Sequence, residues 1–373
     1  MERDALAEAV AWAARTLPSR STLPVLAGLH LTAEGEQLVI SSYDHDVSAR
    51  ITVAATVLET GATLVSGRLL ADIARSLPSA PVALESQGSR IAIACGRASF
   101  TLPTLPIEEY PQLPDMPASS GHLPGPAFAA AVAQVAVAAG RDDTLPTLTG
   151  IRMGFEGTAM FLAATDRYRL AVRELTWQPE SPGISTHALV LARTLADTAK
   201  SLAGADAVHL ALGSQTGASG LMGFEGAGRR TTTRLLDGEF PKYQQLLPTE
   251  LSTTAQVETS LLVDAVKRVA LVAERHASVR LGFTAGEVVL RAGAGEEAQA
   301  SEAVECTLDG DDIEIAFNPG YLLDGLAALD APVAHFSFTV AAKPAVLTGV
   351  AEAGAQPTQE YRYVLMPVRL TTG

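Results

Sequence analysis

Three short features recur along the chain at nearly one spacing, and this repeat restricts the fold more than any other property of the sequence. Thr22-Leu23-Pro24 returns as Thr144-Leu145-Pro146, 144 − 22 = 122 residues later. A four-residue stretch within an expected helix recurs three times, and its last residue is Asp72, Asp197 or Asp324, with spacings of 125 and 127 residues. One third of the 373 residues is about 124. The chain is therefore predicted to contain three copies of one structural unit.

Each copy combines two helices with a larger number of strands joined by tight turns, which predicts an α+β fold with antiparallel sheets. The stretch Ala118–Gly121 predicts a linker, and the three domains are expected at residues 1–117, 121–248 and 250–373. Three such units in line would form an arc, and two arcs joined head to tail would close into a ring without a free sheet edge. Helices are expected at Glu2–Leu17, Arg68–Leu77, Pro126–Ala139, Ala192–Leu202, Leu261–Glu274 and Tyr321–Leu329.

The last segment of the chain, Tyr363–Met366, has the apolar pattern of a strand that stops at Pro367. Proline lacks the N–H donor of a sheet ladder, so it is expected at a sheet edge or just beyond one. Such a segment either closes a core or forms a groove wall that another chain can use.

Composition limits the function without choosing it. Lys and Arg total 27 against 41 Asp and Glu, a net charge of −14 that argues against nucleic acid unless the basic residues gather on one surface. Cys95 and Cys306 lie far apart with no CxxC, which fits a reducing cytosol and predicts no zinc site or disulfide framework. The start Met1-Glu2-Arg3-Asp4 and the lack of a long apolar run predict neither signal peptide nor membrane span.

The sequence offers little support for catalysis. Asp44-His45-Asp46 resembles an acid–base or metal cluster, but alternate residues of a strand point to opposite faces. Gly223–Gly228 does not match GxGxxG and is expected to form a hairpin turn. No GxSxG, HExxH or Walker pattern occurs. We therefore expect no catalytic residue, no metal and no cofactor.

Four motifs in fixed order resemble a known family. They are Ala164–Leu170, Glu239–Tyr243 with Leu247-Pro248, Phe317-Asn318 with Tyr321, and Val364–Leu370. The chain resembles, over essentially its whole length, the bacterial DNA polymerase III beta subunit, the DNA sliding clamp. The resemblance implies three similar domains per subunit and a head-to-tail homodimer ring of six domains, with twelve helices lining the hole. It implies a cytoplasmic, nucleoid-associated processivity factor that encircles duplex DNA without sequence specificity and tethers the replicative polymerase, the clamp loader and other clamp-binding proteins.

The resemblance also implies a groove for short apolar partner peptides between the second and third domains. This chain departs from the family at Arg167, where many members have a small residue, and at Gln245 and His276, so the ligand preference stays open. Ordinary core packing is the alternative for each apolar member. The implied groove residues are Leu148, Thr165, Arg167, Tyr168, Arg169, Leu170, Pro241, Gln245, Leu246, His276, Asn318, Tyr321, Val364, Met366, Pro367, Val368, Arg369 and Leu370.

Basic residues on or near the helices are candidates for facing DNA. Arg75 and Lys200 occupy equivalent repeat positions, where the third repeat has Ala327. The alternative is that each is an ordinary solvated charge. The candidates are Arg15, Arg20, Arg68, Arg75, Arg141, Arg193 and Lys200.

For the joint between subunits, the resemblance points to Phe100 and Leu102 of the first domain meeting Ala270 and Leu271 of the third. Arg97 is expected to face Glu302 or Glu305. Ala270 is smaller than the usual aliphatic residue of the family, so this joint is expected to be less filled.

Other functions stay open at this point. A specialised clamp paralogue, for example an inhibitor-resistance copy, or a non-replicative interaction scaffold would share the same repeats. An enzyme with an unrecognised site is the third possibility.

Overall fold

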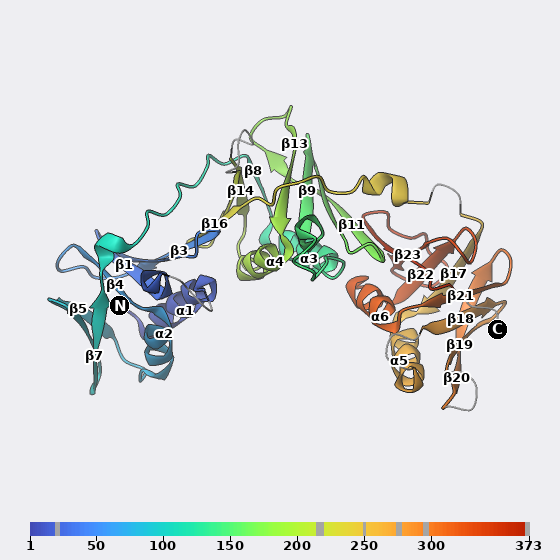
Figure 1. Ribbon diagram of the computed structural model, residues 1–373, viewed down its shortest axis with the longest axis horizontal. Coiled ribbons are helices and arrows are strands. Elements are labelled where there is room, and N and C mark those ends of the chain that lie inside the picture. The colour runs from blue at the N-terminus through green and yellow to red at the C-terminus, as the bar shows by residue number, and fades with distance from the viewer. Residues whose placement is uncertain (19–22, 214–219, 249–250, 274–277, 294–297, 370–373) are drawn as a thin grey trace. The chain divides into compact units, whose positions relative to one another are not determined.

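The computed structural model describes residues 1–18, 23–213, 220–248, 251–273, 278–293 and 298–369 (Figure 1). The chain divides into two compact units. The first contains Met1–Ala129, Gln178–Ser181 and Asp197–Leu235, and the second contains Ala130–Trp177, Pro182–Ala196 and Leu236–Gly373. Among the described residues, each unit carries one continuous 12-stranded sheet.

The sheet of the first unit joins strands of the first repeat to strands of the central repeat, in the order β12-β8-β14-β15-β16-β3-β2-β1-β4-β7-β6-β5. The two repeats meet where β3 pairs antiparallel with β16, and we call this pairing the first seam. The strands are β1 Gly28–Glu34, β2 Gln37–Tyr43, β3 Val47–Ala54, β4 Gly61–Ser66, β5 Val82–Gln87, β6 Arg90–Cys95, β7 Ala98–Leu105, β8 Gly121–Leu123, β12 Gln178–Pro179, β14 Val208–Leu212, β15 Leu221–Gly226 and β16 Arg229–Arg234.

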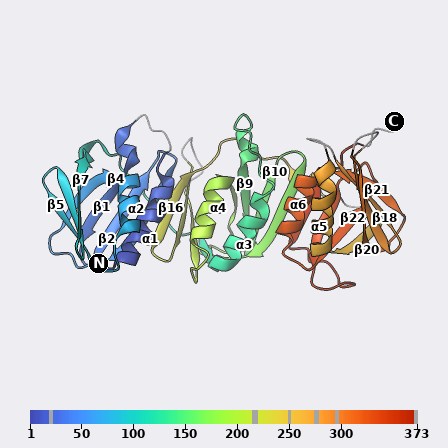
Figure 2. The ribbon, with the colours of Figure 1, turned by 90° about the horizontal axis from the view of Figure 1, so that it is seen from below.

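Helices α1 (Arg3–Ala13) and α2 (Gly67–Ser76) lie side by side against this sheet (Figure 2). Their apolar faces bury Leu6, Val10 and Leu70 against strand residues in one core cluster. Burial of each such side chain contributes about 1.5–3 kcal/mol. The first helix is shorter than predicted. It continues as a single 3-10 turn, and Leu17 is extended because a residue that precedes proline disfavours the helical conformation.

The sheet of the second unit has the order β13-β9-β10-β11-β24-β23-β22-β17-β20-β19-β18-β21. Here strands of the central and third repeats meet where β11 pairs antiparallel with β24, and we call this pairing the second seam. The strands are β9 Gly150–Glu156, β10 Ala159–Thr165, β11 Arg169–Thr176, β13 Ser185–Leu191, β17 Thr253–Glu258, β18 Val279–Thr284, β19 Glu287–Ala292, β20 Ala300–Asp309, β21 Ile313–Phe317, β22 Val333–Phe338, β23 Ala345–Val350 and β24 Tyr361–Leu365.

The third repeat has helices α5 (Thr259–Val269) and α6 (Pro319–Ala328), which contact each other. The central repeat has α3 (Gly125–Ala136) and α4 (Ala192–Ser201). Two α-helices in each repeat, among the described residues, agree with the prediction. None of these helices is long and apolar enough to cross a membrane.

Two local predictions have different outcomes. Gly223–Gly228 forms the β15–β16 hairpin as expected, with Ala227 and Gly228 both at positive φ. Asp44-His45-Asp46, in contrast, is not part of a strand but the turn between β2 and β3. The Asp44 carboxylate accepts hydrogen bonds from the N–H groups of Asp46 (3.1 Å) and Val47, so it fixes this turn.

Candidate functional site

The first part of the site is the turn between β10 and β11. The Asp166 carboxylate accepts from the N–H groups of Tyr168 (3.0 Å) and Arg169 (3.1 Å), as an aspartate does in an Asx turn. Thr165 Oγ1 donates to the Arg169 carbonyl at 2.6 Å and accepts from the Arg167 N–H. The turn requires a φ of +79° at Arg167, a value that a non-glycine side chain rarely adopts. The side chains of Arg167 and Tyr168 are consequently exposed.

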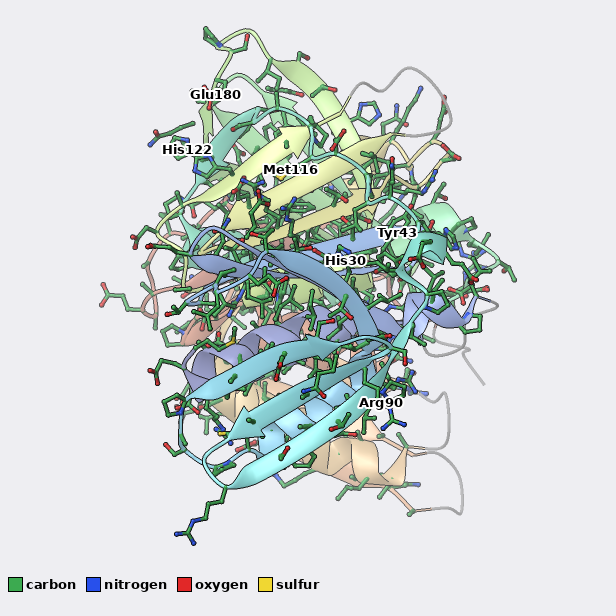
Figure 3. All side chains as sticks on the ribbon, turned by 90° about the vertical axis from the view of Figure 1, so that its left-hand side faces the viewer. His30, Tyr43, Arg90, Met116, His122 and Glu180 are labelled. Atoms are coloured by element: carbon green, nitrogen blue, oxygen red, sulfur yellow. The ribbon has the colours of Figure 1, made fainter. Side chains whose placement is uncertain are left out.

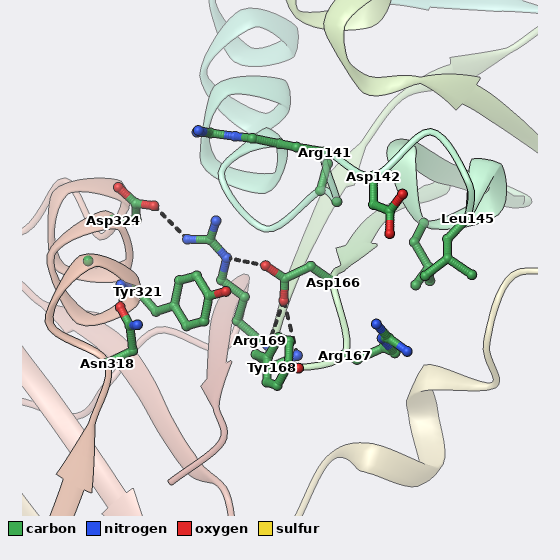
Figure 4. A pocket seen from close by; sticks show the side chains of 14 residues that line it. Arg141, Asp142, Leu145, Asp166, Arg167, Tyr168, Arg169, Asn318, Tyr321 and Asp324 are labelled. Carbon is green, nitrogen blue, oxygen red and sulfur yellow. Dashed lines mark hydrogen bonds and ion pairs between the residues drawn. The ribbon is translucent and has the colours of Figure 1, made fainter. Parts of the chain in front are cut away.

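Arg169 is held between two carboxylates (Figure 4). Its Nε donates to Asp166 at 2.9 Å and its Nη1 donates to Asp324 of α6 at 2.6 Å, while its Cζ lies 4.4 Å from the centre of the Tyr321 ring. The residue is only 6% exposed. Burial opposes the charge, but the bond to Asp324 and the nearby Tyr363 and Asp166 outweigh it and raise the pKa of Arg169. This arginine is thus fixed and neutralised.

Tyr363 of β24 completes the support. Its hydroxyl donates to the Tyr321 carbonyl at 2.8 Å, and burial raises its pKa although Arg169 opposes this. The ring passes so close to α6 that a Cβ at Gly325 would lie 2.4 Å from it, so only glycine fits there. Asn318 caps α6 by accepting from the Tyr321 N–H at 3.2 Å.

A cavity of about 540 Å³ opens beside this network. Its lining is mixed, and we call it the polar cavity because several charged side chains line it. Tyr168 and Tyr321 stack in it with ring centres 6.0 Å apart. It is lined by Ala139, Gly140, Arg141, Asp142, Leu145, Leu148, Asp166, Arg167, Tyr168, Arg169, Asn318, Gly320, Tyr321 and Asp324 (Figure 4).

A second, smaller cavity of about 230 Å³ is mostly apolar. Its floor contains Leu170 and Val364, which are directly paired across the second seam. One wall comes from the segment that leads to Tyr243, whose buried ring packs on Leu170 and Val364 in one hydrophobic cluster. The lining residues are Thr165, Arg167, Arg169, Leu170, Pro241, Leu246, Val364 and Met366. Aliphatic and methionine side chains suit varied apolar anchors.

The chain beyond β24 runs on along the site. Met366 N–H donates to the Tyr168 carbonyl at 2.9 Å, and Val368 N–H donates to Ala316 of β21 at 2.8 Å. Pro367 therefore lies just past the strand end, as the sequence predicted. Val368 is 41% exposed.

The two cavities bring together most of the implied groove residues. Gln245, Pro367, Val368 and Arg369 line neither cavity. His276 and Leu370 lie outside the described residues. The sequence reasoning missed eight of the residues that line the polar cavity: Ala139, Gly140, Arg141 (predicted only to face DNA), Asp142, Leu145, Asp166, Gly320 and Asp324. Asp166 and Asp324 had a signal, because the first lies within a quoted motif and the second marks the repeat.

The candidates for facing DNA that the structure describes are all exposed: Arg15, Arg68, Arg75, Arg141, Arg193 and Lys200. Arg75 lies 3.5 Å from Asp72 on the same helix. Arg20 lies outside the described residues.

The residues implied for the subunit joint differ in exposure. Leu102 is 2% exposed within the core of the first repeat, and Phe100 packs partly against the same cluster. Leu271, in contrast, is 84% exposed. Glu302 already accepts two hydrogen bonds from Arg268, at 2.9 and 2.5 Å, whereas Arg97 and Glu305 are exposed.

Comparison with known proteins identifies the family. Models of the DNA polymerase III beta subunit match in chain order: its N-terminal domain at residues 1–114, its central domain at 122–242 and its C-terminal domain at 244–369. The chain belongs to the DNA polymerase III beta subunit family. It is 58% identical over 371 residues to the beta sliding clamp of Streptomyces coelicolor, which covers 100% of this chain and 99% of that protein.

Other relatives agree. The beta sliding clamp homolog GriR of Streptomyces muensis is 46% identical over 369 residues, covering 99% of this chain and 98% of that protein. The DnaN sliding clamp of Pseudomonas aeruginosa, solved bound to griselimycin, superposes with a TM-score of 0.91 at 26% identity and covers 99% of this chain and 98% of that one. The Bacillus subtilis clamp has a TM-score of 0.91 at 25% identity, covering 100% of this chain and 98% of that one.

These matches confirm the predicted fold of three clamp domains and the function of a DNA sliding clamp. The DNA polymerase III beta subunit family consists of processivity factors rather than catalysts. Membership implies DNA, a polymerase and a second subunit as partners, and ring closure is a property of the family.

Proposed function

We propose that this sliding clamp tethers its partners through the apolar cavity at the second seam. The observation that carries this proposal is the cavity of about 230 Å³ over Leu170 and Val364, because an apolar opening beside a fixed arginine can hold the anchor of a short peptide. The adjacent polar cavity with Tyr168 and Tyr321 extends the groove along the same turn. The replicative polymerase, the clamp loader and other clamp-binding proteins are the proposed partners.

Titration with a leucine-containing peptide tests the groove. We expect Met366→Ala and Leu170→Ala each to weaken binding by about 1–2 kcal/mol, since each removes apolar contact area. Leu69→Ala is a matched control, because Leu69 is an exposed leucine of α2 in the first unit. Unchanged affinity in both groove variants would remove the groove assignment.

We also propose that two chains close a ring by pairing β7 of one copy with β20 of the other. β7 is the last strand of its repeat, as β16 and β24 are of theirs. Each of these three strands pairs antiparallel with the strand that precedes it in the chain. β20 is likewise equivalent to β3 and β11. In the pairings of the described residues, Ala98–Pro103 and Ala300–Glu305 each have a strand partner on one edge only. An exposed edge of this kind pairs readily with another chain.

The two seams within the chain supply the register of the third. Arg229, the first residue of β16, lies opposite Ile51, and Tyr361, the first residue of β24, lies opposite Arg173. Ile51 and Arg173 pair in turn with the fourth residues of β2 and β10. The residue of β20 that pairs with the fourth residue of β19 is Glu302. Ala98 of one copy is therefore proposed to lie opposite Glu302 of the other, and Phe100 opposite Ala300.

This register chooses between the two carboxylates expected to face Arg97. Arg97 precedes Ala98, so its side chain is on the other face of the sheet, opposite Ala303 and diagonal to Glu305. Glu302 is on the face of Ala98 and Phe100, where Arg268 already holds it. Arg97 is thus proposed to pair with Glu305, and the exposed Leu271 to meet Phe100.

Charge reversal measured by analytical ultracentrifugation tests the pair. Arg97→Glu and Glu305→Arg are each expected to weaken dimerisation about two- to fivefold, and the double variant to recover part of the loss. Arg97→Glu combined with Glu302→Arg is the control that should show no recovery. Recovery with Glu302 instead of Glu305 would show that the register is wrong.

The exposed arginines and lysine on the helices are proposed to contact the DNA backbone, which makes binding sequence-independent and strongly dependent on salt. The test uses nicked circular DNA and a clamp loader. The protein is expected to stay on circles and to slide off after linearisation. Free loss from closed circles would contradict clamp function for this chain.

The specialised paralogue remains the second candidate. The chain shares 58% of its residues with the beta sliding clamp of Streptomyces coelicolor and 46% with GriR, and this difference supports the replicative clamp. Replacement of the replicative clamp in a cell by this chain would test the choice directly, since a specialised copy would fail to sustain growth.

A further inference from the structure

We infer that Arg167 makes the groove selective for peptides that carry a carboxylate beside their apolar anchor. This inference rests on the proposed function of the groove as a peptide site. It concerns which peptides bind best.

Arg167 occupies the point that the two cavities share. It lines both the polar cavity and the apolar one, together with Arg169 and no other residue. Its side chain is exposed, and its left-handed backbone directs it away from the strand ladder of β10 and β11. A ligand that fills the apolar cavity therefore passes this guanidinium.

Most of the other charges at the groove are already matched. The exception is Arg141 of the polar cavity, which takes part in none of the ion pairs among the described residues and does not line the apolar cavity. Arg169 is held by Asp166 and Asp324, at 2.9 and 2.6 Å. Asp142 of the polar cavity accepts from the Thr144 hydroxyl at 2.7 Å and from its N–H at 3.0 Å, and these bonds, with a smaller contribution from the charge of Arg167, lower the pKa of Asp142. Arg167 takes part in none of the ion pairs found among the described residues.

The apolar cavity has no negative charge of its own. Apart from the two arginines, its lining consists of Thr165, Leu170, Pro241, Leu246, Val364 and Met366. Its net charge is thus set by Arg167, because the charge of Arg169 is balanced. An aspartate, a glutamate or a chain-terminal carboxylate next to the anchor would complement that charge, and a lysine there would be repelled.

The probe is a set of synthetic peptides with one pair of leucine anchors. Within the set, a single aspartate or asparagine is moved through the positions that flank the anchors. A further pair differs only in a free or amidated C-terminus, which separates a side-chain carboxylate from a terminal one. Affinity is measured by fluorescence anisotropy at low and high salt.

For the wild-type chain, one aspartate position or the free terminus is expected to bind about three- to fivefold more tightly than its neutral partner, the size of a partly exposed ion pair. The preference should shrink at high salt, disappear in Arg167→Ala and invert in Arg167→Glu. Arg167→Lys should keep it, and Arg167→Gly should remove it while it preserves the left-handed turn.

Arg90→Ala is the matched control, since Arg90 is an exposed arginine of β6 in the first unit (Figure 3). It should leave both affinity and preference unchanged. For Arg167→Ala the readout is the ratio of the affinities of the charged and the neutral peptide, because the loss of a lining side chain acts on both peptides.

Two outcomes would overturn the inference while the groove stands: a carboxylate preference that survives in Arg167→Ala, or no preference at any position. Failure of the neutral peptides to bind the wild-type chain is a different result. It would remove the proposed groove function itself, and the selectivity with it.

Discussion

The first and second seams have the same backbone frame. β3 of the first repeat and β11 of the central repeat each pair with the last strand of the next repeat. Each of these two strands follows a turn whose aspartate, Asp44 or Asp166, accepts from two main-chain N–H groups. The next residue, His45 or Arg167, has a φ of 79° in both turns.

The side chains on that frame differ. Where Leu170 lies opposite Val364 in the second seam, Ser48 lies opposite Thr232 in the first, and their hydroxyls are 2.6 Å apart. After the last strand pair, Met366 N–H donates to the turn of the second seam and Arg234 N–H donates to the turn of the first.

The Arg234 side chain contacts the β2–β3 turn of the first seam, because its Nε donates to the His45 carbonyl at 2.9 Å. Beside it, Tyr43 at the end of β2 donates its hydroxyl to the same carbonyl at 3.1 Å (Figure 3). The first seam is therefore closed by polar bonds, whereas the second is open and apolar. At three equivalent positions the second seam has Leu170, Val364 and Met366 where the first seam has the polar residues Ser48, Thr232 and Arg234.

The largest difference between the seams is expected for Arg169→Ala. The change leaves Asp166 and Asp324 without their cation. Because Asp324 is 45% exposed, we expect the free energy of unfolding to fall by about 2–3 kcal/mol, less than for a fully buried pair. The equivalent Val47→Ala in the first seam should lose about 1–2 kcal/mol through lost packing. Hydrogen exchange at the β11–β24 and β3–β16 amides measures each seam separately. Equal losses would show that the ion network adds nothing.

A transplant of the first seam into the second should abolish the groove. Leu170→Ser with Val364→Thr reproduces the pair Ser48 and Thr232, so the strands should still pair. Loss of two apolar side chains from the cavity should weaken binding of a leucine peptide by about 2–3 kcal/mol, roughly 30- to 150-fold. Ser48→Ala with Thr232→Ala is the matched control in the first seam and should leave peptide affinity unchanged. A retained affinity in the transplant would place the anchor elsewhere.

Alkaline pH should weaken the second seam more than the first. Burial raises the pKa of Tyr363 above its ordinary value near 10, so the folded chain favours the neutral phenol. Its contribution is complete below pH 10 and falls as pH rises above 10, by up to about 1.4 kcal/mol per pH unit. The equivalent residue of the first seam is Thr231, which does not titrate. Amide exchange of β24 compared with β16 at pH 9 and 11 measures this. Tyr363→Phe should reduce the dependence, and the remainder is expected from Tyr361 of the same strand, whose pKa is also raised by burial. A parallel loss in both seams would point to general alkaline unfolding.

The sequence was sufficient for the repeats, the pairs of helices and the motif that forms the β10–β11 turn. These features are local, since a turn, a helix period and a proline stop depend on neighbours in the chain. It was not sufficient to place Asp324 on Arg169 or Asp142 beside the groove, because both depend on contacts between segments distant in sequence. The proposed register, in which Arg97 pairs with Glu305 rather than Glu302, also required the observed strand pairing.

The prediction for Asp44-His45-Asp46 shows a related limit of sequence reasoning. These are three titratable side chains in a row, and strand alternation was the wrong reason to reject them as a catalytic cluster. The structure shows an aspartate that fixes a turn, with the histidine at its left-handed position. The equivalence of Asp44 with Asp166, 166 − 44 = 122 residues apart, was available in the repeat offset.

The smallest expected effect concerns the left-handed turn residue that both seams share, His45 in the first and Arg167 in the second. Glycine adopts positive φ without the strain of a side chain, so His45→Gly and Arg167→Gly should each stabilise their turn by up to about 1 kcal/mol. Thermal unfolding and amide exchange of the two turns measure this, with Ala227→Gly in the β15–β16 hairpin as a third left-handed position for comparison. Peptide selectivity should change only for Arg167→Gly, because His45 belongs to the closed seam. If instead the two variants differ in stability by more than about 1 kcal/mol, the side chain of Arg167 makes structural contacts that its exposure hides, and its role in selectivity would have to be separated from that support.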